Sequence, residues 1–391
     1  MPREFANGIA GARIAMILTN PFAPDRRVLK EATSLAEAGA DVVIFAWDRS
    51  GSYPSTERVT PNLSVRRFHV RSENGLGARQ LPRFLQYWRV VAKAIRAESW
   101  DVIHAHDLDG LVAASLCSRA ARRVVFDAHE LFPLMVEEKL GAIAGRAAWG
   151  IERQLLKVPH LVITDGEARA RVYRNVLGVP EVVSLENTVD AGSFGDRDAL
   201  RAVRRAELGI PSDAWVIGVF TFLSQARSLD LLWQAAAELN DVYIVVCGDG
   251  AGAAKVRELA KRNVRVRFLG HVRDVESWYA TTDMIYYAVD PGSRNSRLGF
   301  PNNVGMAVGA GIPILTTNVG FCAHLVRRYG LGKVMRAASV ENVCESVAQI
   351  RNPDTYRELV ASAQRARERL SWKRSERELL EAYQRLLRRT N

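Results

Sequence analysis

The stretch from Pro301 to Gly320, PNNVGMAVGAGIPILTTNVG, carries the clearest structural pattern in the chain. Asn302 and Asn303 are favourable N-cap residues, so a short helix is predicted to begin there and to end at Gly311. The residues from Ile312 to Thr317 are apolar and β-branched, as in a parallel strand that is buried on both faces. A helix that is followed closely by a buried strand is typical of an α/β fold.

The start of this predicted helix is a hypothetical anion site. The N–H groups of a first helical turn have no partner within the helix, and their partial positive charge favours a phosphate. An ordinary helix-to-strand connection without any ligand explains the same local pattern equally well. The two interpretations stay open at this point.

Outward from this stretch, predicted strands and helices alternate along most of the chain. Near the start, the strands Arg13 to Thr19 and Asp41 to Trp47 flank a helix over Arg26 to Ala38. This order is a βαβ unit, whose strands are parallel. Another helix is predicted over 134–157. The fold class is therefore α/β.

The chain is too long for one ordinary core, so we predict two domains from its 391 residues. The alternation lapses into polar sequence around Asn187 to Asp198 and resumes with a strand at Trp215. We place the domain linker there, which divides the chain into domains over 1–190 and 191–370.

Composition narrows the expected compartment and partners. Lys and Arg exceed Asp and Glu by 54 − 43 = 11, which suits a phosphorylated substrate, an anionic membrane surface or nucleic acid. The basic residues are spread along the chain without a recognition motif, so no nucleic-acid partner is expected. The sequence has no CxxC pair, no apolar run of about 18 residues and no signal-peptide core, which favours a cytoplasmic protein with reduced thiols.

A helix predicted near 81–96 has an apolar face with basic residues around it. The apolar positions at helical spacing are Leu81, Phe84, Leu85, Trp88, Val91, Ala92 and Ile95. The surrounding basic residues are Arg71, Arg79, Arg83, Arg89, Lys93 and Arg96. An apolar face usually packs against a core. Because basic residues surround this apolar face, it also suits peripheral contact with anionic lipid at the inner membrane face.

Polar residues that follow predicted strands are candidates for a site. His104, His106 and Asp107 follow one strand of the first half, and His129 and Glu130 follow another. Ligands of α/β sheets bind outside the carboxyl ends of the strands, where a histidine can orient a hydroxyl or take its proton. A structural hydrogen-bonding role is the alternative for each residue. The His-x-His pair lacks further metal ligands nearby in the sequence, so no metal site is predicted.

In the second half, Gly248, Asp249 and Gly250 let the backbone approach a ligand closely or simply turn. Arg294 and Arg297 precede the Pro301 helix and can add positive charge to a phosphate site. The chain has no Walker A sequence and no G-x-G-x-x-G after its first strand, which argues against a mononucleotide kinase and a classical dehydrogenase. It has no serine nucleophile elbow either.

Taken in order, several motifs resemble those of one enzyme family. The first half contains NPFAPDRRVLKEATSLAEAGADVVIFAWD, DVIHAHDLDGLVAA, VVFDAHELFP and LVITDGEARARVY. The rest of the chain contains ENTVDAGSF, IVVCGDG, VRFLGHV, VESWYATTDMIYYAV and SWKRSERELLEAYQRLL. Their order and spacing over nearly the whole chain resemble the group 1, or family 4, glycosyltransferases.

The resemblance implies a GT-B architecture, in which two Rossmann-like domains with parallel sheets face a cleft. It implies a nucleoside-diphosphate sugar as donor, bound mostly by the second domain, and an acceptor bound mostly by the first. It implies no metal ion and no cofactor. It also implies that a C-terminal helix over 371–391 returns to the first domain.

Residue roles are assigned with the same resemblance. His129 falls on the active-site histidine of the family, and Asn302 and Asn303 begin the donor helix. The other residues assigned to the donor are Asn20, Arg26, Arg227, Gly248, Asp249, Gly250, His271, Val272, Arg294, Arg297 and Gly299. The residues assigned to the acceptor side are His104, His106, Asp107 and Glu130.

Some positions depart from the family pattern. The family usually carries two glutamates around the donor helix, and Leu298 and Met306 occupy those positions here. The second glutamate binds the donor ribose in the family, so Met306 removes that contact. Of the basic pair that holds the diphosphate, only Arg227 keeps its charge, and Arg294 and Arg297 are candidates to compensate.

The predicted activity is metal-independent transfer of a sugar to a hydroxyl, with retention at the anomeric carbon. The expected acceptor is a lipid-linked glycan, a polysaccharide or another glycoconjugate. One alternative is a catalytically weak or inactive glycosyltransferase-like protein that binds nucleotide sugars, which Leu298 and Met306 favour. Another is a sugar-nucleotide epimerase of the same architecture.

Overall fold

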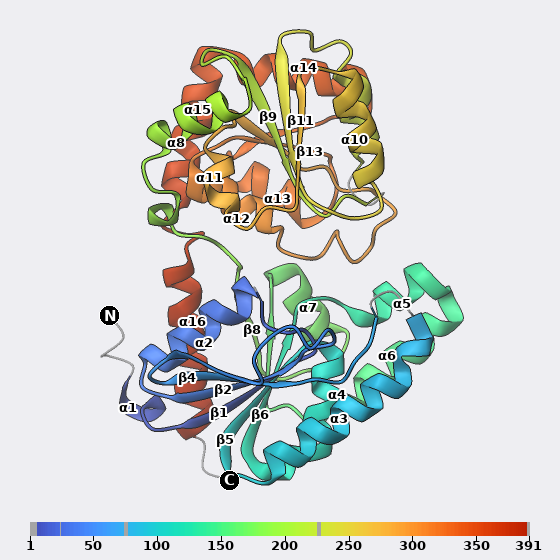
Figure 1. Cartoon of the computed structure of the whole chain (residues 1–391), viewed down its shortest axis with the longest axis vertical. Helices are drawn as coiled ribbons and strands as arrows, with labels where there is room; N and C mark the ends of the chain where they lie inside the picture. Colours follow the sequence, from blue (N-terminus) through green and yellow to red (C-terminus); the bar gives the residue numbers. More distant parts are fainter. Residues whose placement is uncertain (1–5, 24, 74–76, 225–227, 389–391) are drawn as a thin grey trace. The chain divides into compact units, whose positions relative to one another are not determined.

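The structure is a computed structural model that describes residues 6–23, 25–73, 77–224 and 228–388 (Figure 1). The chain forms two compact units. The first unit combines Met1–Leu185 with Ser375–Asn391, and the second is Glu186–Arg374. Each unit has its own sheet with helices packed around it, so the α/β prediction with two Rossmann-like units is confirmed.

The sheet of the first unit has the strand order β3-β4-β2-β1-β5-β6-β7-β8. Its strands are β1 (Arg13–Leu18), β2 (Asp41–Trp47), β3 (Thr56–Thr60), β4 (Leu63–Phe68), β5 (Trp100–His106), β6 (Ala121–Ala128), β7 (Leu161–Thr164) and β8 (Val182–Ser184). All neighbouring pairs are parallel except the edge hairpin of β3 and β4. Strand β3 was not predicted, because its exposed TERVT sequence lacks the apolar pattern of a buried strand.

Most helices of the first unit follow a strand, in βα order. They are α1 (Ala6–Ile9), α2 (Arg26–Glu37), α3 (Leu81–Arg96), α4 (Asp107–Cys117), α5 (Phe132–Leu140), α6 (Ala142–Leu155), α7 (Glu167–Asn175) and α16 (Trp372–Arg388), with short 3-10 turns at Gly77–Gln80 and Ser118–Ala120. The single helix predicted over 134–157 is wrong. Gly141 has a φ of +88° and its N–H closes α5 on the carbonyl of Glu137, which separates α5 from α6.

Helix α16 completes the core of the first unit. Its buried residues Leu379, Leu380, Tyr383 and Leu386 belong to the same apolar cluster as the central strands β1 and β2. The sequence is strongly amphipathic, with its charged residues on the opposite face.

Helix α3 packs mainly as a core helix. Val91, Ala92 and Ile95 are buried, and the ring of Phe84 meets that of Trp47 edge-on at 4.9 Å. Only the first turns of its apolar face remain open, with Leu81 53% and Leu85 41% exposed. In the described part of the chain, no helix is long and apolar enough to cross a bilayer.

The sheet of the second unit is parallel throughout, in the order β11-β10-β9-β12-β13-β14. Its strands are β9 (Trp215–Phe220), β10 (Val242–Cys247), β11 (Val266–Gly270), β12 (Met284–Tyr286), β13 (Ile314–Thr316) and β14 (Gly332–Val334). Its helices are α8 (Arg197–Glu207), α9 (Leu229–Ala235), α10 (Ala253–Arg262), α11 (Val275–Tyr279), α12 (Asn302–Ala310), α13 (Gly320–Tyr329), α14 (Val340–Arg351) and α15 (Pro353–Ala366), after a 3-10 turn at Ala191–Phe194. Helix α13 and strand β14 were not predicted from the sequence.

Candidate functional site

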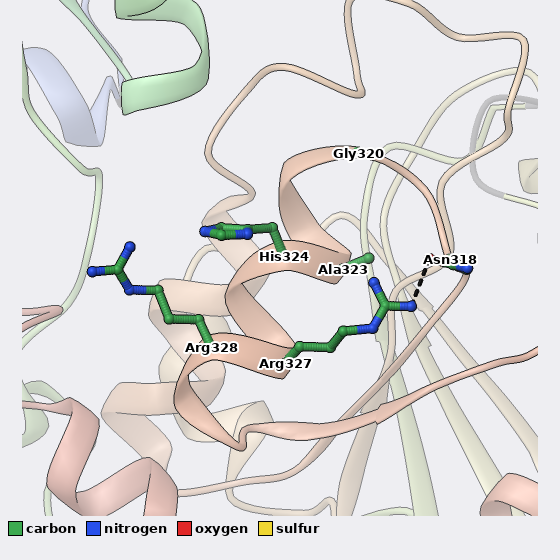
Figure 2. A pocket seen from close by; sticks show the side chains of 6 residues that line it. All are labelled: Asn318, Gly320, Ala323, His324, Arg327 and Arg328. Atoms are coloured by element: carbon green, nitrogen blue, oxygen red, sulfur yellow. Dashed lines mark hydrogen bonds between the residues drawn. The ribbon is translucent and has the colours of Figure 1, made fainter.

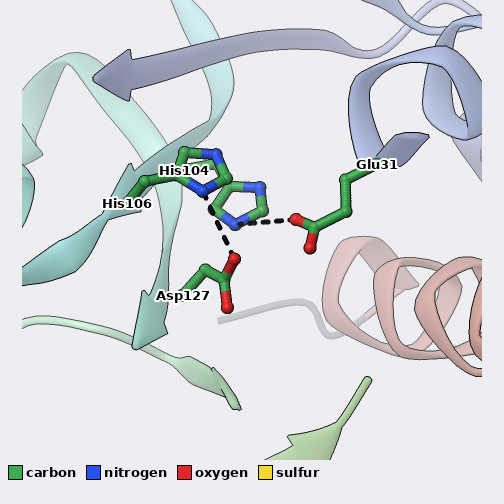
Figure 3. Close-up of side chains that lie close together, drawn as sticks. All are labelled: Glu31, His104, His106 and Asp127. Atoms are coloured by element: carbon green, nitrogen blue, oxygen red, sulfur yellow. Dashed lines mark ion pairs between the residues drawn. The ribbon is translucent and has the colours of Figure 1, made fainter. Parts of the chain in front are cut away.

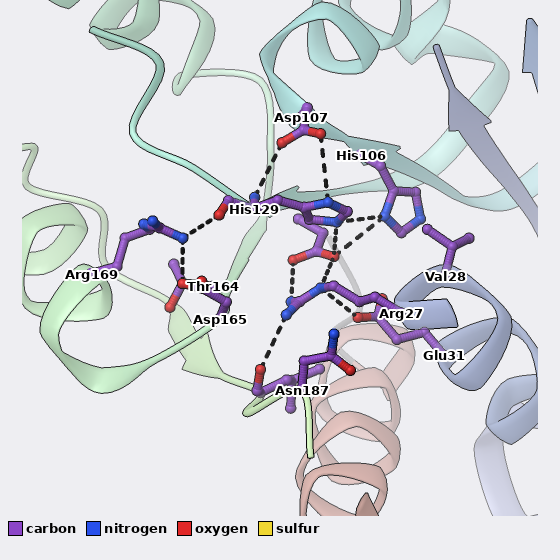
Figure 4. Close-up of polar contacts among 12 residues, drawn as sticks. Arg27, Val28, Glu31, His106, Asp107, His129, Thr164, Asp165, Arg169 and Asn187 are labelled. Carbon is purple, nitrogen blue, oxygen red and sulfur yellow. Dashed lines mark hydrogen bonds and ion pairs between the residues drawn. The ribbon is translucent and has the colours of Figure 1, made fainter. Parts of the chain in front are cut away.

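A connected group of charged side chains lies at the carboxyl ends of β5 and β6 (Figure 4). Its centre is Asp127 near the end of β6, and this side chain is fully buried. Arg27 of α2 donates from Nε to Oδ2 of Asp127 at 2.9 Å and from Nη2 to Oδ1 at 2.6 Å. The planar guanidinium matches the carboxylate at two points, so each side chain fixes the other.

The pKa of Asp127 lies well below that of an ordinary aspartate. Burial alone would raise it, but the positive charges of Arg27 and His129 and hydrogen bonds from His106 and His129 lower it. Asp127 is therefore ionised at neutral pH, and the neighbouring cations compensate for its burial.

His129 follows β6 directly and turns both ring nitrogens toward carboxylates. Its Nε2 lies 2.8 Å from Oδ2 of Asp127, and its Nδ1 lies 3.5 Å from Oδ2 of Asp107. Burial opposes protonation, but the two carboxylates outweigh it and raise the pKa of His129 to about 10. A ring in this position is an imidazolium, which has two N–H donors and no lone pair to accept a proton.

The loop that carries His129 is held from two sides. Arg169 of α7 donates to the backbone carbonyl of His129 and to the carboxylate of Asp165. Oδ1 of Asp107 accepts the backbone N–H of His129 at 3.3 Å. Burial raises the pKa of Asp107 to about 6, although the charge of His129 opposes the rise. These contacts fix both the backbone and the ring of His129.

A second layer lies deeper, between α2, β5 and α16. Glu31 and His104 are fully buried. The hydroxyl of Tyr383 lies 2.8 Å from Nδ1 of His104, and Oε2 of Glu31 lies 3.9 Å from Nε2 of the same ring. Burial raises the pKa of Glu31 to about 8, with Asp127 acting in the same direction and Arg27 against it. The Glu31 carboxyl is therefore mostly protonated at neutral pH.

Four buried residues of this region place potential metal-ligand atoms close together (Figure 3). The ligand atoms of Glu31, His104, His106 and Asp127 all lie within 4.8 Å of one another. Only the His-x-His pair was visible in the sequence, because the two carboxylates come from distant elements. Arg27 already holds a positive charge 2.6 Å from Asp127 and 3.2 Å from Glu31, which disfavours a second cation. The absence of a metal stays a prediction.

The other residues assigned to the first half are placed differently. Asn20 shapes its own loop, since its Nδ2 donates to Asp25 at 2.9 Å and its Oδ1 accepts from the N–H of Phe22 at 2.8 Å. Arg26 is the first residue of α2. Glu130 is exposed next to His129. Of the residues assigned to the acceptor side, the structure therefore brings His106 and Asp107 into contact with His129, leaves Glu130 at the surface and buries His104.

The glycines after β10 allow one loop to approach another. Gly248 has a φ of +155°, and a Cβ there would lie 1.9 Å from the carbonyl oxygen of Thr221. A Cβ on Gly250 would lie 2.9 Å from the carbonyl oxygen of Leu223, and the N–H of that leucine donates to the carbonyl of Asp249. Close backbone packing within the second unit therefore accounts for both glycines.

The start of α12 differs from the sequence prediction. Pro301 is the N-cap residue, and Asn302 and Asn303 lie inside the first turn. Asn303 is buried and its Oδ1 accepts the hydroxyl of Tyr279 at 2.5 Å, while Oδ1 of Asn302 accepts from Asn187 at 3.1 Å. The helix ends as predicted at Gly311, which has a φ of +70°. The asparagine side chains thus serve packing and the linker, and an anion site at this turn stays a prediction that depends on its backbone amides.

The remaining donor assignments fall mostly on the surface. Arg294, Arg297 and His271 are exposed, and Val272 and Gly299 are half-buried. Met306 is 7% exposed and belongs to the core cluster of the second unit. Arg227 lies outside the described residues.

Several residues that hold His129 or its neighbours were not predicted from the sequence. Arg27, Glu31 and Arg169 were not assigned, and neither was Tyr383. A signal existed for the first two, because an arginine and a glutamate four residues apart share one face of a predicted helix. That face is buried, and a buried charged pair needs partners from another element.

Two family models match the chain. One, described as Glycosyltransferase Family 4, matches residues 25–192. The other, described as Glycosyl transferases group 1, matches residues 215–352.

Several relatives are similar over much of the sequence. A D-inositol 3-phosphate glycosyltransferase of Salinispora tropica is 28% identical over 393 residues, and the match covers 91% of this chain and 79% of the relative. A D-inositol 3-phosphate glycosyltransferase of Mycobacterium avium is 29% identical over 242 residues, and the match covers 58% of this chain and 55% of the relative. The chain thus spans about half the length of this mycobacterial relative.

Solved structures share the fold at low sequence identity. Sucrose-phosphate synthase from Thermosynechococcus elongatus has a TM-score of 0.80 and 17% identity, with 96% of this chain and 99% of that chain covered. Anabaena Alr3699/HepE in complex with UDP-glucose has a TM-score of 0.71 and 18% identity, with 94% and 98% covered. These structures are similar to both units of the chain.

Proposed function

The chain belongs to the group 1, or family 4, glycosyltransferases and transfers a sugar from a nucleotide sugar, and we propose that the sugar goes to a hydroxyl of a glycan without help from a metal ion. The proposed acceptor is a lipid-linked glycan, a polysaccharide or another glycoconjugate. The proposed donor is a uridine-diphosphate sugar, because the similar HepE structure holds UDP-glucose.

The observation that carries this proposal is the placement of His129. It stands at the exit of β6, is 22% exposed at its side chain, and is held between the carboxylates of Asp127 and Asp107. An imidazolium at a strand exit donates hydrogen bonds to a sugar hydroxyl or to a phosphate oxygen that gains negative charge as it leaves. Such electrostatic support replaces what a metal ion would supply.

The same geometry limits the acid–base chemistry. His129 has no free lone pair while both nitrogens face carboxylates, so it does not serve as the base for the acceptor hydroxyl. In the proposed reaction the bond from the anomeric carbon to the phosphate oxygen breaks and a bond to the acceptor oxygen forms. The departing phosphate oxygen takes the acceptor's proton. Attack and departure on one face of the sugar retain the anomeric configuration.

The proposed donor contacts lie in the second unit. The first-turn amides of α12 and the exposed guanidinium of Arg297 are suited to a diphosphate. Met306 is packed into the core at the position of a ribose-binding carboxylate, so the phosphates contribute more to donor binding than the ribose does.

A transfer assay with UDP-glucose and a panel of glycan and polyol acceptors tests the proposal. We expect His129→Ala to lower transfer by at least ~100-fold, the scale of a lost polar or acid–base contact, and to leave UDP affinity unchanged. His69→Ala is the control, because this histidine is 39% exposed. A chelator should leave the rate unchanged. A near-normal rate of His129→Ala would contradict the role of His129. Loss of activity with the chelator would contradict transfer without a metal ion.

A protein that binds nucleotide sugars without turnover is the second candidate, and the apolar Met306 favours it. Calorimetry with UDP-glucose separates the two. Tight binding with neither transfer nor hydrolysis across the panel favours the binding protein.

We also propose peripheral contact with an anionic membrane at the cytoplasmic face. The exposed Leu81 and Leu85 at the start of α3, with the exposed Arg83, Arg89 and Lys93 along it, support this contact.

A further inference from the structure

A cavity of about 370 Å³ lies along α13 in the second unit (Figure 2). Its lining residues are Asn318, Gly320, Ala323, His324, Arg327 and Arg328. Three of these six side chains are basic and none is acidic. The site assignments above include none of them.

The two arginines of the cavity lack the ion pairs that some other arginines of the same unit make. Arg201 pairs with Asp283 at 2.6 Å, and Arg351 pairs with Asp241 at 2.6 Å. Within the described residues, neither Arg327 nor Arg328 has a carboxylate at ion-pair distance. The cavity thus gathers positive charge that the protein itself leaves uncompensated, and an anion would compensate it.

The basic side chains are partly organised before any ligand binds. Nη2 of Arg327 donates to Oδ1 of Asn318 at 2.6 Å, which orients the guanidinium. The ring of His324 stacks on Phe321 with centroids 5.9 Å apart. His324 and Arg328 are four residues apart and extend from the same side of α13, as Figure 2 shows. An organised group loses less side-chain freedom when it binds.

We propose that this cavity binds the phosphate of a small phosphorylated sugar or polyol. Guanidinium groups and an imidazole are suited to a phosphomonoester dianion. The volume is at the small end of the range of ligand pockets, about 300–1,000 Å³, and fits a molecule of a few carbons. Sugar transfer is not a premise, so the cavity can bind this ligand whether or not the chain turns over a donor.

The cavity adjoins the loop assigned to the donor. The N–H of Phe321 in α13 donates to the carbonyl of Arg297 at 2.7 Å, and Gly320 packs against the backbone of the same arginine. A phosphate could therefore come from the nucleotide donor or from a second molecule. Saturation with UDP distinguishes these two sources.

The helix dipole is the simplest competing explanation for the two arginines at this place. Arg327 and Arg328 lie in the last turn of α13, where cations are favourable without any ligand. Arg262 is a matched control, because it lies in the last turn of α10, is exposed and belongs to the same unit.

Isothermal titration of the full chain with inorganic phosphate, glucose 6-phosphate and glucose tests the proposal, with and without saturating UDP. We expect glucose 6-phosphate to bind in the presence of UDP and glucose not to bind. The double variant Arg327→Gln/Arg328→Gln should weaken glucose 6-phosphate by at least about tenfold and leave UDP affinity unchanged, because the charge-assisted contact to the phosphate is lost. Arg262→Gln should change neither.

Three outcomes would overturn the proposal. Competition by UDP would place the phosphate in the donor site. Equal binding by the double variant would exclude α13. The absence of any phosphate binding would leave Arg327 and Arg328 as helix-end charges only. Thermal unfolding of the double variant checks that it is folded.

Discussion

One group of charged side chains in the first unit and one in the second balance their charges in opposite ways. In the first unit, Arg27, Asp127 and His129 form a compact group in which each charge faces an opposite one at 2.6 to 2.8 Å. In the second unit, Arg297, Arg327 and Arg328 are exposed, and none of them has a carboxylate at ion-pair distance within the described residues. The first group supplies its own counter-charges, and the second has none at ion-pair distance among the described residues.

The first group is preorganised by its own pairs, whereas the second is suited to attracting an anionic ligand. A buried, fully paired network holds one side chain in one geometry, which suits a group that must stabilise charge at a fixed point. Exposed cations attract anionic ligands and respond to salt. Changes in the first group should therefore alter folding stability and turnover, and changes in the second group should alter affinity.

The largest effect is expected from removing a cation of the buried network. Arg27→Met leaves Asp127 buried without its two-point partner and should destabilise the protein by ~3–5 kcal/mol. Arg357→Met is the control, because its pair with Asp354 is 76% and 85% exposed and should contribute at most ~1 kcal/mol. Denaturant unfolding measures both. Equal effects of the two variants would remove the distinction between buried, paired charges and exposed ones.

The next effect is a pH dependence of stability. The pKa of His129 is raised to about 10 in the folded chain, so its contribution is full below the unfolded pKa of ~6.5 and is lost as pH rises toward 10. Glu31, with its pKa raised to about 8, acts in the same direction at lower pH. Between about pH 8 and 10 the unfolding free energy of the wild-type chain should fall more steeply with pH than that of His129→Gln. The two slopes should differ by at most ~1.4 kcal/mol per pH unit. Parallel curves would show that His129 is neutral in the folded protein.

A smaller effect is expected for donor affinity. UDP should bind more tightly than uridine, and the gap should shrink as salt rises, because the phosphates carry the contact. Arg297→Ala should weaken UDP about tenfold, since one charge-assisted contact is lost, and leave uridine unchanged. Arg262→Ala is the control, and calorimetry is the measurement. If uridine and UDP bind equally, the first turn of α12 is not a phosphate site.

The smallest effect concerns the membrane. Leu85→Gln should weaken binding to anionic vesicles about fivefold, or ~1 kcal/mol, because a partly exposed leucine no longer enters the interface. Leu116→Gln on α4 is the control, with 49% of its side chain exposed against 41% for Leu85. Vesicle sedimentation at two salt concentrations measures both. Equal sedimentation of the wild-type chain with neutral and anionic vesicles would reject the contact.

The fold was largely predictable because its signal is local. Apolar strands such as RIAMIL and DVVIFAW alternate with amphipathic helices, and that order determines a parallel α/β sheet. The missed strands lack such a signal. Strand β14 has three half-buried residues, and β3 is exposed on an edge.

The site was predictable only in part. A strand exit identified His129 and Asp107, because position along the chain is enough for that inference. The partners of His129 depend on which side chains meet in space. Arg27 lies 100 residues from Asp127, and Tyr383 lies 279 residues from His104. Neither periodicity nor a motif reports such a pairing.

Helix α16 has a consequence for the order in which the protein can be completed. The hydroxyl of Ser34 donates a hydrogen bond to Oε1 of Glu376 at 2.8 Å, although 342 residues separate the two in the sequence. Leu379, Tyr383 and Leu386 lie in the core of the first unit. No stretch of chain that ends before this helix contains that whole core. The second unit, by contrast, is continuous from Glu186 to Arg374. During synthesis from the N-terminus, the unit that emerges first is therefore the last to receive all of its core.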